Sequence, residues 1–246
     1  MLIVDTQAFQ ESVHSGDVKA LLLLIRFPDH VDRTLPGRSY FDSLCNQQIK
    51  TYFAEQSYGT YRITCDVKNW QVADNTEKLY AGGQAGQLGF DRSGAFITPI
   101  LDKLAEEQFP FYEYDSNDDG SVDILLAIHS GFSSTQPGGE ECGNGQKDRM
   151  RNQATSISNL YTDPVWGISI SSYAISSAFT RLCNFENFAG MGVMTHEWIH
   201  TFGMREAPID TYDTSTGAFD ILARPAGFYN SIAEPGSLSP FSKDNV

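Results

Sequence analysis

Two histidines four residues apart, His196 and His200, constrain this chain more than any other feature of its sequence. They stand in "MTHEWIHTFGM" (194–204), a largely apolar stretch that favours a helix. Side chains at positions i and i+4 of a helix lie on the same face, one turn apart. The spacing therefore predicts a helix over 191–204 with both imidazoles on one side, and Gly203 as its terminator.

Two neutral imidazoles arranged in this way can bind one Zn²⁺ at about 2.0–2.1 Å. Glu197, the next residue after His196, points about 100° further round the helix. We therefore expect it to act as the general base toward a zinc-bound water rather than as a ligand, which is the H-E-x-x-H mechanism. The alternative is a helix with two ordinary histidines. Because the chain has only five histidines and two of them flank this glutamate, zinc is favoured.

The pattern extends beyond the second histidine to H-E-x-x-H-x-x-G-x-x-E, with Glu206 as its last residue. A glycine at position 203 lets the backbone turn off the helix, so that Glu206 can return as a third zinc ligand. Metzincins have histidine at this position, so the glutamate departs from their pattern. Asp210 and Asp213 in "APIDTYD" (207–213) are the competing candidates for the third ligand.

Composition limits the possible partners of this 246-residue chain, whose length suits a single domain, 1–246. Its formal net charge of -14 argues against nucleic acid and against an anionic membrane surface. The apolar run "ALLLLI" (20–25) is too short to cross a bilayer. The first ten residues lack the features of a signal peptide. We expect a monomer that acts on protein or peptide substrates.

Four widely spaced cysteines allow three disulfide pairings, and none of them forms a C-x-x-C knuckle. Two buried bridges formed in an oxidising compartment are the favoured interpretation, and four buried thiols are the alternative. The cysteines are Cys45, Cys65, Cys142 and Cys183.

Strands and helices alternate along the chain, which predicts an α/β (α+β) domain around one mixed, twisted sheet. An exposed edge strand is expected just before the histidine helix, where it could hold an extended peptide. A long polar surface loop is expected at 131–165. The expected strands are 18–27, 60–70, 121–131 and the edge strand 167–179, and the expected helices are 38–59, 94–109 (with Pro99 in its first turn) and 191–204.

A second candidate metal site is the acidic stretch "DSNDDGSVD" (115–123). It places oxygen side chains at positions 1, 3, 5 and 9 of a calcium-loop template, with Gly120 at position 6. Position 12 is Leu126 instead of glutamate, so a simple Asp/Asn/Gly turn is the alternative. His129 is expected to be a core histidine outside the zinc site. The candidate calcium ligands are Asp115, Asn117, Asp119 and Asp123.

Beyond these sites, the chain resembles the immune inhibitor A-type family of secreted metallopeptidases over most of its length, from about residue 20 to 243. The similarity includes the Gly-Val-x-x-His-Glu helix with a downstream Tyr-Asp, and a turn in which Leu222 stands where the family has methionine. The stretches that carry it are "LLIRFPDH" (23–30), "YFAEQSYGTYRIT" (52–64), "YDSNDDGSVDILLAIHSG" (114–131), "GVMTHEWIHTFGMREAPIDTYD" (192–213), "GAFDILARPAG" (217–227) and "LSPFSK" (238–243).

The resemblance implies a zincin-like catalytic domain with zinc endopeptidase activity, in which an upper part of about 1–203 ends with the zinc helix and a loop-rich lower part of about 204–246 follows. It carries the zinc ligands over to His196 and His200 and the base to Glu197. The family usually has aspartate at the third-ligand position, where this chain has Glu206, and Leu222 is expected to form an apolar floor under the metal. Members are secreted with a signal and a propeptide, neither of which is visible in this chain.

Three functions remain open at this point. The leading one is a zinc endopeptidase, and the intact His196, Glu197 and His200 favour it. The alternatives are a catalytically silent zincin-fold protein that binds a partner, and a zinc hydrolase that cleaves a non-peptide amide. A nucleophilic hydrolase is disfavoured because the chain has no G-x-S-x-G elbow.

Overall fold

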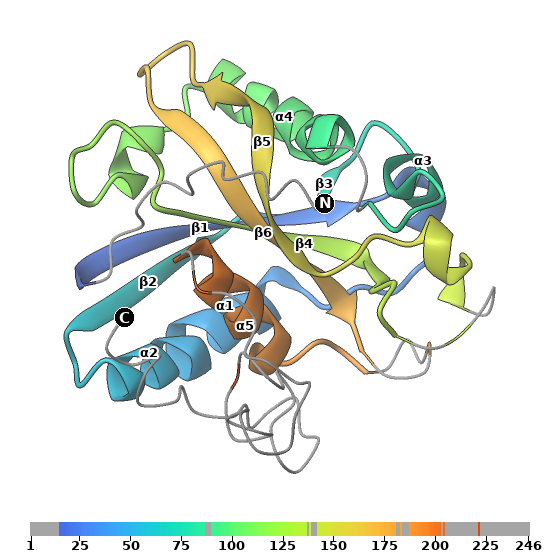
Figure 1. Ribbon diagram of the computed structural model, residues 1–246, viewed down its shortest axis with the longest axis horizontal. Coiled ribbons are helices and arrows are strands. Elements are labelled where there is room, and N and C mark those ends of the chain that lie inside the picture. Colours follow the sequence, from blue (N-terminus) through green and yellow to red (C-terminus); the bar gives the residue numbers. More distant parts are fainter. Residues whose placement is uncertain are drawn as a thin grey trace, which may run out of the picture.

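The computed structural model describes residues 15–86, 90–136, 138, 142–180, 183, 187–202, 204 and 221. Within them a six-stranded sheet lies between two layers of helices (Figure 1). The strands are β1 (Gly16–Arg26), β2 (Tyr61–Val67), β3 (Gln71–Val72), β4 (Ile124–Phe132), β5 (Gln153–Thr162) and β6 (Ser169–Phe179). The α-helices are α1 (Arg38–Ser43), α2 (Lys50–Gln56), α3 (Glu77–Ala81), α4 (Phe90–Glu106) and α5 (Met191–Thr201).

Short helical turns complete these elements. A π-helical turn joins α1 to α2 without a break, so the helix expected over 38–59 is confirmed in substance. The turns are η1 (Pro28–His30), η2 (Leu44–Ile49, the π-helical one), η3 (Phe111–Tyr114) and η5 (Gln146–Asp148).

The main sheet order is β2-β1-β4-β6-β5, with β3 paired to the end of β1. Every pair is parallel except β5–β6, which is antiparallel. A parallel sheet covered on both faces needs apolar side chains on both sides of its central strands. The runs "ALLLLI" in β1 and "ILLAI" in β4 provide them, and every residue of β4 is buried. The mixed α/β fold is therefore as expected.

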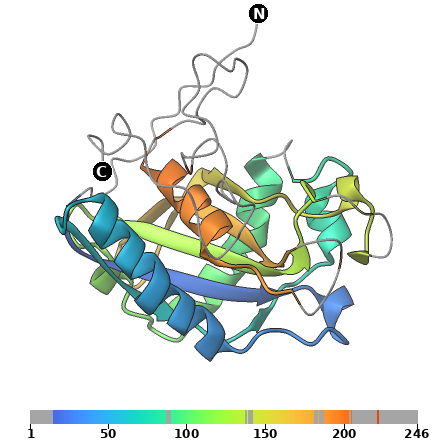
Figure 2. The ribbon, with the colours of Figure 1, turned by 90° about the horizontal axis from the view of Figure 1, so that it is seen from below.

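The two faces of β1 support two separate apolar cores, because successive side chains point to opposite sides of a strand. Leu22 and Leu24 pack into the first core together with α1, α2 and α5. Leu21 and Leu23 pack into the second core with α3 and α4. Figure 2 shows α1–α2 and α5 side by side on the first face.

Strand β6 corrects one expectation, because it is not an exposed edge. It lies between β4 and β5, and its second half is buried. Its alternation of serine with apolar residues suggested a solvent-facing side. Instead Ala174 and Ala178 face the core that contains α5, with Ser176 between them on the same side. These small side chains allow the helix to pack close to the sheet.

Two further expectations were wrong in detail. The segment 131–165 is not a single loop, since β5 occupies Gln153–Thr162 within it. The serines and the asparagine of β5 are residue types common in loops, but here they belong to a strand at the border of the sheet. Helix α4 starts at Phe90, so Pro99 lies inside the helix rather than in its first turn. A proline there has no N–H to give to the carbonyl one turn earlier.

Candidate metal centre

Helix α5 is fixed to the sheet by its apolar face. Met194, Trp198 and Ile199 are completely buried in the first core. The Trp198 ring lies 5.3 Å from the ring of Phe53 in α2, measured between centroids. The helix ends at Thr201, just before the expected terminator at Gly203, which lies outside the described residues. The polar residues of the motif, His196, Glu197 and His200, lie at other positions of the same helix.

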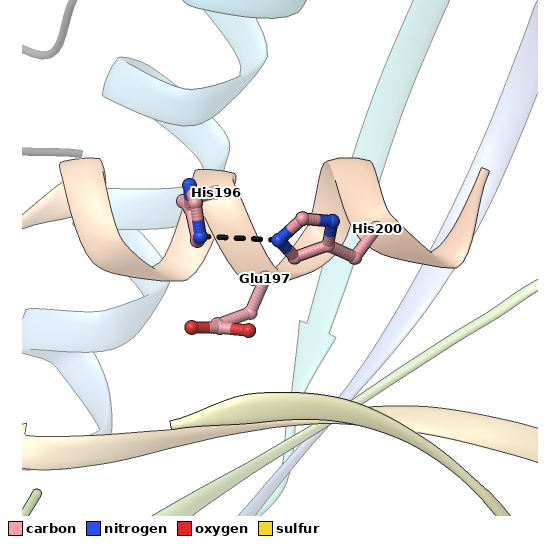
Figure 3. A group of neighbouring side chains, drawn as sticks. All are labelled: His196, Glu197 and His200. Carbon is pink, nitrogen blue, oxygen red and sulfur yellow. Dashed lines mark hydrogen bonds between the residues drawn. The ribbon is translucent and has the colours of Figure 1, made fainter. Parts of the chain in front are cut away.

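His196 and His200 face each other across one turn of α5, and their Nε2 atoms are 3.1 Å apart (Figure 3). The two rings are nearly perpendicular, with an interplanar angle of 84°. His196 is buried and His200 is partly exposed. The predicted convergence of the two imidazoles on one face is therefore present.

Both rings are held in one tautomer by backbone carbonyls. Nδ1 of His196 donates to the carbonyl of Ile221 at 2.8 Å, and Nδ1 of His200 donates to the carbonyl of Met204 at 2.7 Å. A carbonyl can only accept, so the proton of each neutral ring is on Nδ1. Both Nε2 atoms are then left with a lone pair, which is the form of imidazole that binds a metal.

The distance between the two nitrogens fits a zinc ion. A tetrahedral ion bonded to two nitrogens at about 2.0–2.1 Å holds them about 3.3 Å apart. The observed separation of 3.1 Å is close to this value. The donor set therefore suits a metal ion. The same distance lies within hydrogen-bonding range, so a single proton on one Nε2 can also join the two rings.

Glu197 completes the group. A carboxylate oxygen of Glu197 and one nitrogen of each histidine all lie within 4.8 Å of one another. Its side chain is buried and points from α5 towards the strands below the helix, to one side of the two rings (Figure 3). The three side chains therefore form one group on α5 that could hold a metal ion.

The residues proposed to complete the site are not among those described. Glu206, its competitors Asp210 and Asp213, and the floor residue Leu222 all lie outside the described residues. Ile221, directly before Leu222, is completely buried in the same core as α5. Its carbonyl is a functional group that sequence reasoning missed, because a backbone acceptor leaves no mark in the sequence.

The acidic turn at 115–123 is organised by its own backbone. The Asp115 carboxylate accepts from the backbone N–H of Asp119 and of Gly120, at 3.0 and 2.8 Å. Asn117 also accepts from the Asp119 N–H, and Asp123 accepts from the N–H of Ser116. Among the described residues, His196, Glu197 and His200 are the only three His, Cys, Asp or Glu side chains that converge closely enough to hold a metal. Calcium at this turn stays a prediction without support.

The four cysteines form two disulfides, as the favoured interpretation predicted. Cys45 in η2 is joined to Cys65 in β2, and Cys142 is joined to Cys183. The first bridge ties the helical layer to the sheet. The second ties the segment after β4 to the connection between β6 and α5. No helix in the described part of the chain is long and apolar enough to cross a membrane.

The sheet border beside α5 is formed by β5, which pairs only with β6 among the described strands. Ala154 lies opposite Ala174, and Ser156 lies opposite Ser172. Since opposed residues share a face and Ala174 faces the core that contains α5, Ala154 and Ser156 lie on that side as well. Between Ser156 and Tyr161 the register shifts and β5 bulges.

Comparison with known proteins agrees with this geometry. The family described as "Immune inhibitor A peptidase M6, catalytic domain" matches residues 33–244. The chain is also 25% identical over 268 residues to "Immune inhibitor A" of Bacillus thuringiensis subsp. alesti, an alignment that covers 86% of this chain. It spans only 36% of the length of that relative. The family match covers most of the chain, and the chain therefore belongs to the immune inhibitor A peptidase family, M6, a family of metallopeptidases.

Proposed function

We propose that the chain is a zinc-dependent endopeptidase domain in which His196 and His200 bind the metal and Glu197 is the catalytic base. One observation supports this above all others. The two Nε2 lone pairs converge at 3.1 Å while both Nδ1 protons are engaged by backbone carbonyls. This arrangement brings the metal-binding nitrogens of two neutral imidazoles to one place. Membership of a peptidase family supplies the class of reaction.

A bound Zn²⁺ would supply a Lewis acid that polarises the peptide carbonyl and lowers the pKa of water at the site towards neutrality. Glu197 would accept the proton of the attacking water and deliver it to the leaving amine. Burial of Glu197 keeps bulk water away from this proton. We further propose Glu206 as the third protein ligand, since a carboxylate oxygen is a good ligand for zinc.

The substrate in this proposal is an extended segment of a protein or peptide. Its backbone would pair with the outer side of β5, next to Ala154 and Ser156, in the manner of an added strand. The sequence analysis expected β6 to bind the peptide, but β6 lies inside the sheet, so β5 takes that place in the proposal. The bulge after Ser156 limits the regular part of that edge to its first few residues.

The organisation of the protein follows from the same reasoning. We propose that residues 1–246 form one catalytic domain that works as a monomer outside the cell. The two disulfides support an oxidising compartment.

The test is the metal content of the purified chain by elemental analysis, combined with casein hydrolysis before and after 1,10-phenanthroline. We expect about one zinc per chain, with cleavage that the chelator stops and added zinc restores. Zinc without cleavage of casein or of peptides would favour the silent binding protein, or a hydrolase of non-peptide amides. A chain that takes up no zinc on incubation would contradict the proposal.

A further inference from the structure

A second cluster of ionisable side chains lies buried at the other end of the sheet, where β1 and β4 finish. At its centre is Glu77, the first residue of α3, whose side chain is completely buried. Its carboxylate is surrounded by groups from three other parts of the chain: the turn after β1, the end of β4, and the segment 142–150. The zinc chemistry proposed above uses none of them.

Donors from these parts meet the carboxylate directly. His30 Nε2 lies 3.4 Å from Glu77 Oε2, and Asn144 Nδ2 donates to the same oxygen at 3.2 Å. The backbone N–H of Met150 donates to Glu77 Oε1, also at 3.2 Å. His30 Nδ1 lies 3.0 Å from both the carbonyl and the hydroxyl of Ser130, which fixes the ring with Nε2 towards Glu77.

The end of β4 is shaped to admit this carboxylate. A Cβ on Gly131 would overlap Glu77 Oε1 and would lie 2.9 Å from His129 Nδ1. The backbone N–H of Gly131 donates to His129 Nδ1, so the single proton of the neutral His129 ring is on Nε2. Glu77 Oε1 is 3.9 Å from His129 Nδ1. The only residue type that fits at position 131 without displacing the carboxylate is glycine.

Other charged groups lie near Glu77. The Arg33 guanidinium, which donates to the carbonyls of Ser130 and Cys142, is a partly buried cation near Glu77. Asp29 accepts from the backbone N–H of Glu77, and its other oxygen is 4.0 Å from His30 Nε2. If Glu77 is protonated, Arg33 loses one of the two carboxylates that compensate its charge in a buried place.

From this arrangement we propose that the Glu77 cluster is an acid-operated latch: protonation of Glu77 releases the segment 142–150 from the ends of β1 and β4 while the sheet remains folded. The latch holds that segment at two points, Asn144 and the Met150 amide, and Arg33 holds it at a third through the Cys142 carbonyl. The disulfide between Cys142 and Cys183 keeps the released segment attached, so the opening is reversible.

Protonation of His129, close to Glu77, adds to the effect of acid on the opening of the segment 142–150. Burial raises the pKa of Glu77, but the hydrogen bond from His30 and the nearby histidine charges outweigh it and hold the pKa below its usual range. Burial lowers the pKa of His129 to about 4. In acid, His129 gains a charge and protonation of Glu77 removes the carboxylate beside it. The His129 and Arg33 cations are then compensated by Asp29 alone, which favours opening.

The experiment is hydrogen exchange of single backbone amides, followed by NMR and expressed as protection relative to an unstructured chain. In the wild-type protein we expect the protection of the Met150 amide to fall at least about tenfold between about pH 6 and about pH 3.5. The amide of Leu23, in the middle of β1, should lose only the protection that the fall in global stability accounts for, so protection at Met150 should fall at least about tenfold relative to that at Leu23. An equal loss of protection at Met150 and Leu23 would mean global unfolding alone and would overturn the proposal.

Two variants separate the latch from general acid sensitivity. Glu77→Gln keeps the shape of the side chain and removes its charge, so its Met150 amide should already exchange rapidly at pH 7, with no further step in acid. Asp148→Asn removes a charge from the same segment, where Asp148 pairs with Lys78 on the surface, and should keep the wild-type profile. If the Met150 amide of Glu77→Gln lost protection in acid to the same extent as in the wild-type protein, the latch would be contradicted. If Glu77→Gln does not fold, the pH dependence of protection at Met150 and Leu23 in the wild-type protein decides between the latch and global unfolding.

Discussion

The Nε2 atoms of His196 and His200 are 3.1 Å apart, while the Nδ1 atom of each ring donates to a backbone carbonyl. Two neutral rings in this tautomer offer both Nε2 lone pairs to one metal ion. The candidate site thus suits a metal ion, and its chemistry can be tested residue by residue.

The first prediction concerns Glu197. Replacement by glutamine removes the base and leaves both histidines in place, so we expect zinc content to stay at the wild-type value. The value of kcat should fall about 10²–10⁴-fold, the usual contribution of a general base. Elemental analysis and peptide hydrolysis measure the two quantities. Glu107→Gln, a change at an exposed glutamate, serves as the control, and turnover of Glu197→Gln at the control's rate would exclude the mechanism.

The second prediction distinguishes the candidates for the third ligand. Glu206→Gln should weaken zinc binding by more than the about 10–100-fold that loss of an outer-shell partner costs. Asp210→Asn and Asp213→Asn should keep the wild-type affinity. Competition with a zinc chelator of known affinity gives all three values. If one of the aspartate variants loses zinc and Glu206→Gln does not, the ligand has been misassigned.

The third prediction concerns the close packing at the end of β4. An added methyl group at Gly131 would overlap the Glu77 carboxylate, so Gly131→Ala should lower the free energy of unfolding by about 1–3 kcal/mol. A methyl group added at Gly145, in the neighbouring segment, would meet no atom within 4 Å, and Gly145→Ala should stay within about 0.5 kcal/mol of wild type. Urea unfolding monitored by tryptophan fluorescence measures both. Equal stability of the two variants would show that the overlap is relieved at no cost.

The fourth prediction is that stability falls in mild acid because of His129. Burial lowers its pKa to about 4, whereas an unfolded histidine titrates near 6.5. Below about pH 6.5 the unfolded chain binds a proton that the folded chain does not, so the free energy of unfolding decreases as the pH falls towards 4. At about 1.4 kcal/mol per pH unit the decrease from this residue amounts to about 3 kcal/mol.

Urea unfolding at pH 7, 5.5 and 4.5 measures this dependence. His129→Gln, which does not titrate, should be less stable than wild type at pH 7 and should have a flatter profile. A wild-type stability that is constant from pH 7 to 4.5 would contradict the assignment of His129 as a buried neutral ring.

Much of the architecture follows from local patterns. The apolar runs of β1 and β4, and the i, i+4 spacing of His196 and His200, each determine their element without reference to the rest of the chain. The position of β6 could not be read in this way, because whether a strand borders the sheet depends on where β5 pairs. Its serines suggested exposure, yet Ser176 and Ser177 are buried.

The buried Glu77 cluster illustrates a second limit. Nothing in "NTEKLY" (75–80) marks the glutamate as buried, and its partners come from residues 30, 144 and 150. A charged side chain on a short helix is usually exposed. Only the assembled fold shows that the chain brings a histidine, an amide and a backbone N–H to it. Likewise, the carbonyl of Ile221 becomes the hydrogen-bond acceptor of His196 Nδ1 only when the folded chain places Ile221 beside α5.

That last contact has a consequence for how the protein is made. The ribosome completes the six described strands by residue 179 and the histidine helix by residue 201, while the acceptor for His196 Nδ1 is residue 221. A nascent chain that has reached residue 201 contains this sheet and the helix but still lacks the carbonyl that sets the tautomer of His196. Metal uptake in the oriented form has to wait until residue 221 has been added. The order of translation thus delays a competent centre until after the sheet has been synthesised.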